Sequence, residues 1–331
     1  MPERGGVPLS VLDTAPVWVD STPARALRES VALARAVEGL GYCRYWVAEH
    51  HNTPSAATSS PAVLIAHLAA VTDTLRVGAG GVMLANHVPL VVAEQFATLQ
   101  ALYPGRIDLG LGRAPGADSA AALALRVGGT VEDFAGQVVE VAGLLRPAGP
   151  GEELTAMPRP EVETPVWVLG SGGAGVRLAA EAGLPLAFAH HIRPELTASA
   201  LAAYRQAFRP SERLERPYAI VAAMVVAAES DERARWLFGP MRSTLATVLR
   251  GGRRGAFVTP AEAAGMVLTP QEVAMADQRY AGQVVGGPDA VKRKVAELVE
   301  ATGADELMAL TVVHDPEERV RSYRILAEAV S

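Results

Sequence analysis

The residues best suited to chemistry stand together near the start of the chain, where Glu49, His50, His51 and Asn52 follow an apolar stretch. Carboxylate, imidazole and amide groups can ligate a metal, transfer a proton or form hydrogen bonds. Neighbouring residues of a strand point to opposite sides, so His50 and His51 cannot both be inward ligands unless the strand has ended, and no zinc-like Cys/His spacing is present. The pattern disfavours a metal site and leaves proton transfer and hydrogen bonding open.

Glycines and one arginine follow other apolar segments. GSGGAG, residues 170–175, satisfies G-x-G-x-x-G, but the acidic residue that a dinucleotide site needs about 20 positions later is absent, because His190 falls there. Small residues at a helix start still expose N–H groups to an anion, so this segment is a phosphate site or a tight turn. Arg113 is a cation for a phosphate or a partner in a salt bridge. Gly80-Gly81 lets a flat ligand approach the backbone, or forms a bulge.

These residues lie where predicted strands end. Eight short apolar segments alternate with helical ones, which is typical of parallel strands buried on both faces and favours a (β/α)8 barrel over an open doubly wound sheet. Functional groups of such a barrel gather at the carboxyl ends of its strands. The predicted strands cover residues 7–16, 42–49, 75–84, 106–112, 165–170, 185–191, 217–228 and 305–313.

A less regular segment, residues 250–280, follows the seventh predicted strand and mixes glycine, arginine and proline with apolar residues. We expect this insertion on the active-site face of a single barrel domain that spans residues 1–331, where it is either a mobile lid or a surface excursion. Equal limited proteolysis with and without ligand would argue against a lid.

The composition limits the class of protein. Of 331 residues, 50% are hydrophobic and 20% are charged, as in an ordinary globular protein with a sizeable core. The net charge of −6 argues against nucleic acid as a partner. The chain shows no secretion signal and no apolar run long enough to span a membrane, and Cys43 is its single cysteine, so we expect a cytoplasmic protein.

Taken together, the runs WVAEHHN, VGAGGVMLANHVPLVVAEQFATL, YPGRIDLGLGRAPGAD and PVWVLGSGG resemble the bacterial luciferase-like flavin-dependent monooxygenases, in their single-chain branch. This resemblance covers almost the whole chain. It implies a TIM barrel that binds reduced flavin mononucleotide (FMN) from a separate reductase, lets O2 add at flavin C4a, and transfers one oxygen atom from the peroxyflavin to a small organic substrate. It also implies a homodimer.

The resemblance also assigns roles to residues. His50 matches a histidine that acts in acid–base steps beside the flavin, with Glu49 as its companion. Gly80 and Gly81 match a pair joined by a non-proline cis peptide under the flavin ring. The other cofactor-binding assignments are Arg113, Ser171, Gly172 and Gly173 at the flavin phosphate, and His190 against the flavin ring.

One departure concerns flavin affinity. Relatives often have a second phosphate-contacting arginine where this chain has Gly136, so we expect flavin to bind weakly and the protein to purify without colour. Two alternatives stay open: the same barrel moving a hydride with the deazaflavin F420, or a flavin-binding protein without turnover.

Overall fold

The chain folds around a parallel sheet that closes on itself. The computed structural model describes residues 6–126, 131–147 and 153–331. Its barrel strands are β1 (Leu9–Asp13), β2 (Arg44–Val47), β3 (Arg76–Met83), β4 (Ile107–Gly112), β5 (Val166–Gly170), β6 (Leu186–Phe188), β7 (Ala219–Ala227) and β9 (Glu306–Leu310). They pair in this order, and β9 closes the circle by pairing with both β7 and β1. The predicted (β/α)8 barrel is therefore confirmed, and an open sheet is excluded.

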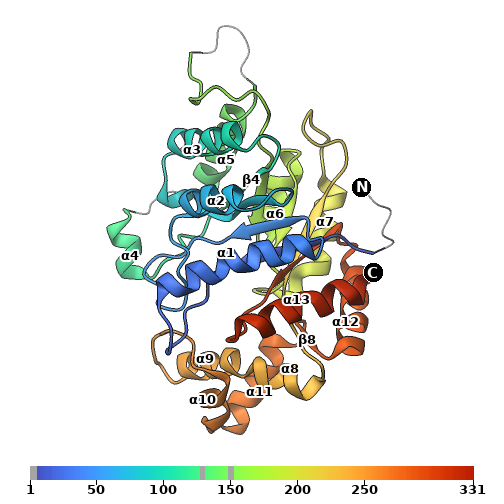
Figure 1. Cartoon of the computed structure of the whole chain (residues 1–331). Helices are drawn as coiled ribbons and strands as arrows, with labels where there is room; N and C mark the ends of the chain where they lie inside the picture. Colours follow the sequence, from blue (N-terminus) through green and yellow to red (C-terminus); the bar gives the residue numbers. More distant parts are fainter. Residues whose placement is uncertain (1–5, 127–130, 148–152) are drawn as a thin grey trace.

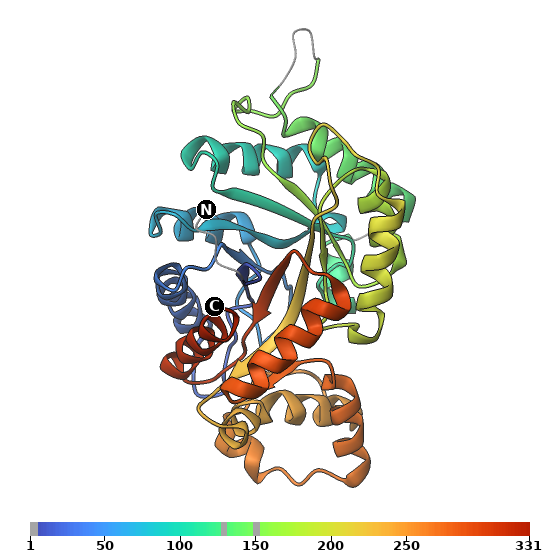
Figure 2. The same ribbon diagram turned by 90° about the vertical axis from the view of Figure 1, so that its right-hand side faces the viewer.

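Helices surround this barrel on its outside (Figures 1 and 2). Those between or after the barrel strands are α1 (Pro23–Gly39), α2 (Pro61–Ala70), α3 (Pro89–Leu102), α4 (Ser119–Ala124), α5 (Val131–Leu144), α6 (Gly173–Glu181), α7 (Thr197–Ala207), α12 (Pro288–Thr302) and α13 (Pro316–Val330). The start of α1 shows why such helices form where they do: Pro23 occupies the first turn and the Thr22 side chain accepts a hydrogen bond from the Arg25 N–H. None of the described helices has the length and apolar character needed to cross a membrane.

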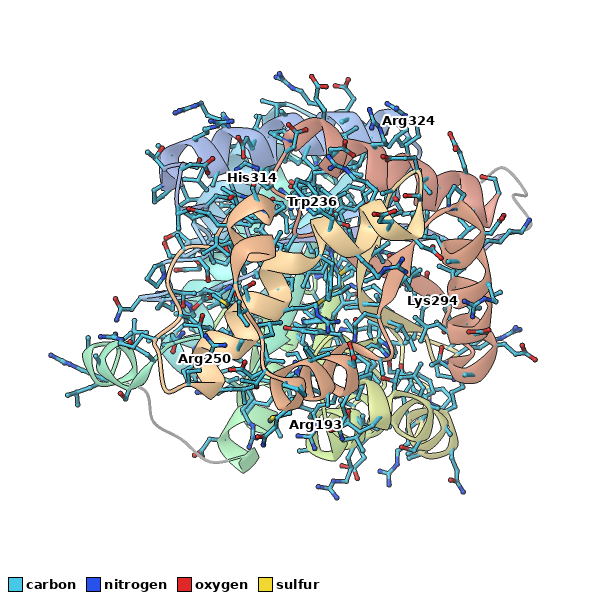
Figure 3. All side chains as sticks on the ribbon, turned by 90° about the horizontal axis from the view of Figure 1, so that it is seen from below. Arg193, Trp236, Arg250, Lys294, His314 and Arg324 are labelled. Atoms are coloured by element: carbon cyan, nitrogen blue, oxygen red, sulfur yellow. The ribbon has the colours of Figure 1, made fainter. Side chains whose placement is uncertain are left out.

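The predicted insertion, residues 250–280, is more regular than its sequence indicates, because it contains α10 (Pro260–Gly265) and α11 (Pro270–Tyr280). It lies between α8 (Asp231–Leu237) and α9 (Gly239–Leu249) on one side and the short strand β8 (Val284–Gly286) on the other, and β8 pairs with the end of β7. Thr259 and Thr269 each form a capping box, with Glu262 and Glu272 respectively, and these boxes start α10 and α11. The helices α8 to α11 gather at one end of the molecule, and Figure 3 looks onto that end.

Ion pairs and two tryptophan side chains close the amino end of the barrel. Arg44, the first residue of β2, pairs with Asp108 at 2.8 Å and with Glu306, the first residue of β9, at 3.0 Å. Trp46 and Trp167 fill the interior above them with ring centroids 5.3 Å apart. The amino end of the barrel is thereby packed shut, so a ligand must enter at the carboxyl ends of the strands.

Candidate active site

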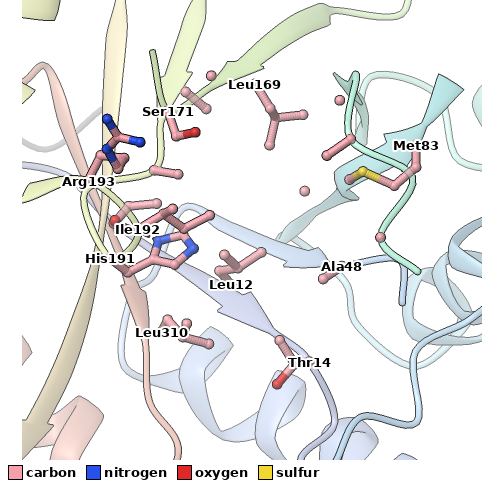
Figure 4. Close-up of a pocket in the computed structure, with 18 of the residues that line it drawn as sticks. Leu12, Thr14, Ala48, Met83, Leu169, Ser171, His191, Ile192, Arg193 and Leu310 are labelled. Carbon is pink, nitrogen blue, oxygen red and sulfur yellow. Dashed lines mark hydrogen bonds between the residues drawn. The ribbon is translucent and has the colours of Figure 1, made fainter. Parts of the chain in front are cut away.

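A cavity of about 1010 Å³ opens at the carboxyl ends of the barrel strands, at the upper end of the size range for small-molecule sites. Figure 4 shows part of its lining, in which Leu12 and Leu310 come from strands on one side and Met83 and Leu169 from strands on the other. Seven residues predicted for the site line this cavity: Glu49, His50, Gly80, Arg113, Ser171, Gly172 and Gly173. Gly81 and His190 are described but do not line it.

His50 reaches the cavity with unused hydrogen-bonding capacity. Its backbone N–H donates to Thr58 O at 2.7 Å, which fixes the main chain after β2. Its Nδ1 is buried and has no hydrogen-bond partner among the described residues. Burial lowers the pKa of the His50 imidazole, and nearby Arg254 and His51 act in the same direction while Glu49 opposes them. His50 is therefore a neutral imidazole near pH 7, able to accept a proton from a ligand.

The Glu49 carboxylate is hydrogen-bonded to other residues of the chain and is not free to bind a ligand in the cavity. Its carboxylate is fully buried and accepts hydrogen bonds from His51 Nε2 at 2.8 Å, His87 Nε2 at 2.9 Å, Asn86 Nδ2 at 2.9 Å and the Met83 backbone N–H at 3.0 Å. Burial raises the pKa of the Glu49 carboxyl, but the bonds from His87, Asn86 and His51 outweigh burial and lower it overall. A carboxylate with this many donors anchors the loops after β2 and β3.

His51 and His87 were not assigned by sequence reasoning. His87 follows β3 far from His51 in the sequence, and only barrel closure places both at Glu49. Since a carboxylate can only accept, each histidine carries its proton on Nε2 there. Asn52 also has a structural contact, because its amide donates to Asp118 at 2.9 Å across the cavity rim.

Glycines form a flat wall on β3 and β4. The Gly80-Gly81 peptide is cis, as the family resemblance implied. A Cβ added at Gly80 would lie 2.8 Å from Leu12 Cδ1, and one at Gly81 would lie 2.7 Å from Gly110 O. Side chains are therefore excluded here, and the backbone stays open to a planar ligand at Gly80.

The start of α6 has the features that favour an anion. Gly172 is the N-cap residue and has no capping side chain, so the first N–H groups of this helix lack a side-chain acceptor. Ser171, Gly172 and Gly173 line the cavity there, together with Arg113 from the end of β4 and Arg177 from α6. Arg113 is exposed and forms no hydrogen bond or ion pair with another described residue. The salt-bridge alternative for Arg113 therefore finds no support in the described part of the chain, and the helix dipole favours an anion.

The two histidines after β6 point in different directions. His190 is buried, with Nδ1 2.8 Å from Thr197 Oγ1 and Nε2 2.8 Å from Gly282 O, so both ring nitrogens are engaged away from the cavity. His191 lines the cavity, with its ring beside Ile192 in Figure 4. Its Nδ1 lies 2.9 Å from Ala222 O and must donate to that carbonyl, which leaves Nε2 as an acceptor. Burial lowers the pKa of His191 to about 4.

Another carboxylate at the end of a strand does not belong to the site. Asp13, the last residue of β1, does not line the cavity; its carboxylate pairs with Arg319 at 2.7 Å and accepts hydrogen bonds from Ser30 and Tyr45. The insertion of residues 250–280 contributes Arg254, Phe257, Arg279 and Tyr280 to the cavity lining, on the active-site face where it was expected. The preceding helix α9 adds Met241, Thr244 and Leu245, which sequence reasoning also did not assign to the site.

The fold and site define a class: a TIM-barrel enzyme whose cavity is lined by glycines of β3, by the uncapped start of α6 and by two histidines whose pKa values are lowered by burial. Within the described ranges, no group of three or more His, Cys, Asp or Glu side chains is placed to hold a metal ion. The family model for luciferase-like monooxygenases matches residues 7–306. The chain belongs to the luciferase-like monooxygenase family, which makes it an oxidoreductase.

Two relatives with named functions match over almost their whole length. A luciferase-like monooxygenase of Escherichia coli strain K12 is 41% identical over 321 residues, which is 96% of each chain. The N-acetyl-S-alkylcysteine monooxygenase of Bacillus subtilis is 31% identical over 330 residues, covering 97% of this chain and 98% of that one.

Solved structures agree on the fold. Apo-MsnO8 superposes with a TM-score of 0.92 at 38% identity, covering 98% of this chain and 99% of that one. The oxygenating constituent of 3,6-diketocamphane monooxygenase from Pseudomonas putida, solved with FMN, has a TM-score of 0.70 at 18% identity and covers 98% of both chains. An F420-dependent secondary alcohol dehydrogenase also has a TM-score of 0.70, at 14% identity, and the match covers 98% of this chain and 99% of that one. Barrels of this fold therefore bind FMN or F420.

Proposed function

We propose that this protein is a monooxygenase that takes reduced FMN from a separate reductase and uses O2 to oxygenate a small organic substrate. The observation that carries the proposal is His50, a neutral imidazole with a buried, unpartnered nitrogen, which lies in the same cavity as a glycine wall and an anion-binding turn. A proton acceptor, a planar surface and a phosphate site in one cavity are what flavin-dependent oxygenation requires.

The residues present fit a flavin nucleotide. Gly80 lines the cavity and has no side chain, because an added Cβ would collide with Leu12 and Trp46, so its bare backbone can lie against a flat ring. Ser171, the open N-terminus of α6 and Arg113 would hold the phosphate. When bound, reduced flavin supplies the electrons that activate O2 for transfer of one oxygen atom to a substrate.

The chain's own residues then handle protons and position the reactants. His50 accepts or returns a proton at its ring nitrogens, because burial keeps it neutral. Glu49 holds the loop that carries His50, and we assign it a positioning role because its carboxylate oxygens are occupied by His51, Asn86, His87 and Met83. Both ring nitrogens of His190 are already hydrogen-bonded and His190 does not line the cavity. We therefore assign contact with the flavin ring to His191, which does line it.

The test combines the protein with a flavin reductase, FMN, candidate substrates and isotopically labelled O2, and follows the products by mass spectrometry. We expect one labelled oxygen atom in the product. We also expect His50→Ala to retain FMN affinity and to lose product formation. F420-dependent reduction of a substrate without O2 would overturn the proposal in favour of hydride transfer, and binding of flavin with no turnover would reduce the protein to a flavin carrier.

Flavin affinity provides a separate test. A Cβ added at Gly136 on α5 would have no other atom within 4 Å, so a longer side chain has room there. We predict that Gly136→Arg tightens FMN binding about tenfold or more, because a charge-assisted contact contributes about 1.5 to 3 kcal/mol. Fluorescence titration of FMN would check this, and unchanged affinity would show that position 136 does not face the phosphate. The weak flavin binding, the homodimer and the cytoplasmic location stay predictions.

A further inference from the structure

The charge of the cavity differs in sign from the charge of the chain. The whole sequence carries a net charge of −6. Among the described residues that line the cavity, five are arginines, namely Arg113, Arg177, Arg193, Arg254 and Arg279, and two are glutamates, Glu49 and Glu181. A cleft of one sign concentrates ligands of the opposite sign. Arg113 and Arg177 lie at the anion-binding turn, which leaves positive charge elsewhere in the cavity that a flavin phosphate does not explain.

Two of the remaining arginines come from the insertion. Arg254 forms no hydrogen bond or ion pair with another described residue. It is close enough to His50 and Tyr280 to influence both electrostatically. Arg279 is fixed by donating from Nη1 to His191 O at 3.2 Å, and its guanidinium lies 5.7 Å from the Tyr280 ring centroid. Neither arginine forms an ion pair with a carboxylate of the described residues. Glu195 pairs with Arg193 at 2.9 Å, and the charge of Arg279 acts on Glu195 only from a longer distance.

The backbone near Arg254 is tied to the barrel rim at Phe257. Arg253 pairs with Asp118 at 3.3 Å, but its side chain is 87% exposed, so this ion pair contributes little to holding the segment. Phe257 exchanges backbone hydrogen bonds with Val17 and Val19 and packs its ring 5.4 Å from Trp18. The contacts of Phe257 hold this segment against the barrel, and Arg254 lines the cavity without an ion-pair partner among the described residues.

The rest of this half of the cavity is apolar. Met224, Met241, Leu245, Phe257, Leu310 and Val312 all line it. Methionine side chains adapt to varied apolar shapes, so this surface suits a hydrocarbon or aromatic body more than a sugar or a nucleotide.

We propose that Arg254 and Arg279 form a carboxylate-binding subsite, and that the substrates of this enzyme are carboxylic acids with an apolar body. The two guanidinium groups hold the carboxylate at the insertion side, and the apolar body extends past the methionines toward His50. This inference rests on the proposed function, because it assigns the second ligand of the same cavity. It predicts that neutral molecules of equal shape bind less well.

The test compares acids with their neutral amides. Octanoate, phenylbutyrate and naphthylacetate are each titrated by calorimetry against the corresponding primary amide, with wild-type protein and with Arg254→Gln, Arg279→Gln and Arg254→Lys. Arg253→Gln is the matched control, since Arg253 is the neighbouring exposed arginine and does not line the cavity. FMN affinity is measured for each variant by fluorescence.

We expect wild-type protein to bind at least one of these acids about tenfold more tightly than its amide, and added salt to reduce that preference. Arg254→Gln and Arg279→Gln should each lose about tenfold in affinity for the acid and change amide affinity less than twofold. Arg254→Lys should recover most of the loss, and Arg253→Gln should match wild type. FMN affinity should stay within twofold throughout.

Three results would overturn the subsite. One is the absence of any acid preference across the three pairs, including the absence of any acid binding. Another is an equal loss with Arg253→Gln, which would indicate a general field effect. The third is loss of FMN affinity with Arg254→Gln or Arg279→Gln, which would assign these arginines to the flavin. Failure of the monooxygenase proposal can be told apart from failure of the subsite. In that case FMN would not bind or oxygen would not be incorporated, while the protein would still bind acids more tightly than their amides.

Discussion

Replacing Glu49 with glutamine tests whether this carboxylate positions the site or transfers protons. The Glu49 side chain is fully buried and accepts from four donors, at distances of 2.8 to 3.0 Å for the shortest bond to each. Glutamine keeps one acceptor oxygen and places an NH2 group where the second oxygen accepted. At least one charge-assisted bond is then lost, at about 1.5 to 3 kcal/mol, and a buried donor is left facing other donors, at about 1 to 3 kcal/mol.

We therefore predict that Glu49→Gln lowers the free energy of unfolding by about 3 kcal/mol or more at pH 7. Because the pKa of Glu49 is lowered in the folded protein from 4.5, its carboxylate stabilises the fold above that pH and loses this effect as the pH falls. The difference between wild type and variant should therefore shrink on acidification below pH 4.5. Urea denaturation followed by circular dichroism measures both effects.

Glu181→Gln is the matched control, because Glu181 is an exposed carboxylate that lines the same cavity and forms no hydrogen bond or ion pair with a described residue. Its stability should stay within about 0.5 kcal/mol of wild type. A Glu49→Gln protein equally stable to wild type would refute the reasoning. If it also lost oxygenation without losing stability, Glu49 would be a proton-transfer group beside His50, as the family resemblance implies.

Three further substitutions probe other parts of the structure. Asp13→Asn should lower the free energy of unfolding by about 3 kcal/mol, because it leaves the buried guanidinium of Arg319 without its charge partner. Urea denaturation measures this, and a loss below about 1 kcal/mol would contradict the reasoning. Gly110→Ala should destabilise the barrel by about 1 to 3 kcal/mol through overpacking against a neighbouring backbone carbonyl, whereas Gly143→Ala on α5, with open space around it, should be neutral or stabilising. The pKa of His191 is about 4 in the folded protein and 6.5 in a free side chain, so the unfolded chain binds a proton at a higher pH than the folded one. The free energy of unfolding should therefore drop by about 2 kcal/mol between pH 7 and pH 5. His191→Gln should lack that part of the loss, and identical pH profiles would argue against a neutral, buried His191.

Local residue order is enough to predict the barrel and the positions of most site residues. Apolar segments of strand length alternate with helical ones along the chain, and this periodicity depends only on local residue order, so all eight barrel strands were predicted. The rule that functional groups lie at the carboxyl ends of strands then placed His50, Gly80, Arg113 and Ser171 in one cavity without any knowledge of side-chain direction.

Side-chain direction was decided only by the tertiary structure. His190 and His191 are adjacent and identical in type, and their order in the sequence does not reveal that Gly282 engages one while the other lines the cavity. Glu49 likewise resembles a catalytic acid until barrel closure brings His87 to its carboxylate. These outcomes depend on contacts between residues far apart in the chain, which no local pattern encodes.

The insertion shows the same limit more strongly. Thr259 and Thr269 carry capping signals for α10 and α11, yet the short, mixed segments between them gave no clear helical period. Arg254 and Arg279 became candidates for ligand binding only because the folded insertion brings them to the cavity lining. Local residue order decides which helices and strands form. The direction in which a charged side chain points depends on how distant elements pack, because only packing brings its partners close in space.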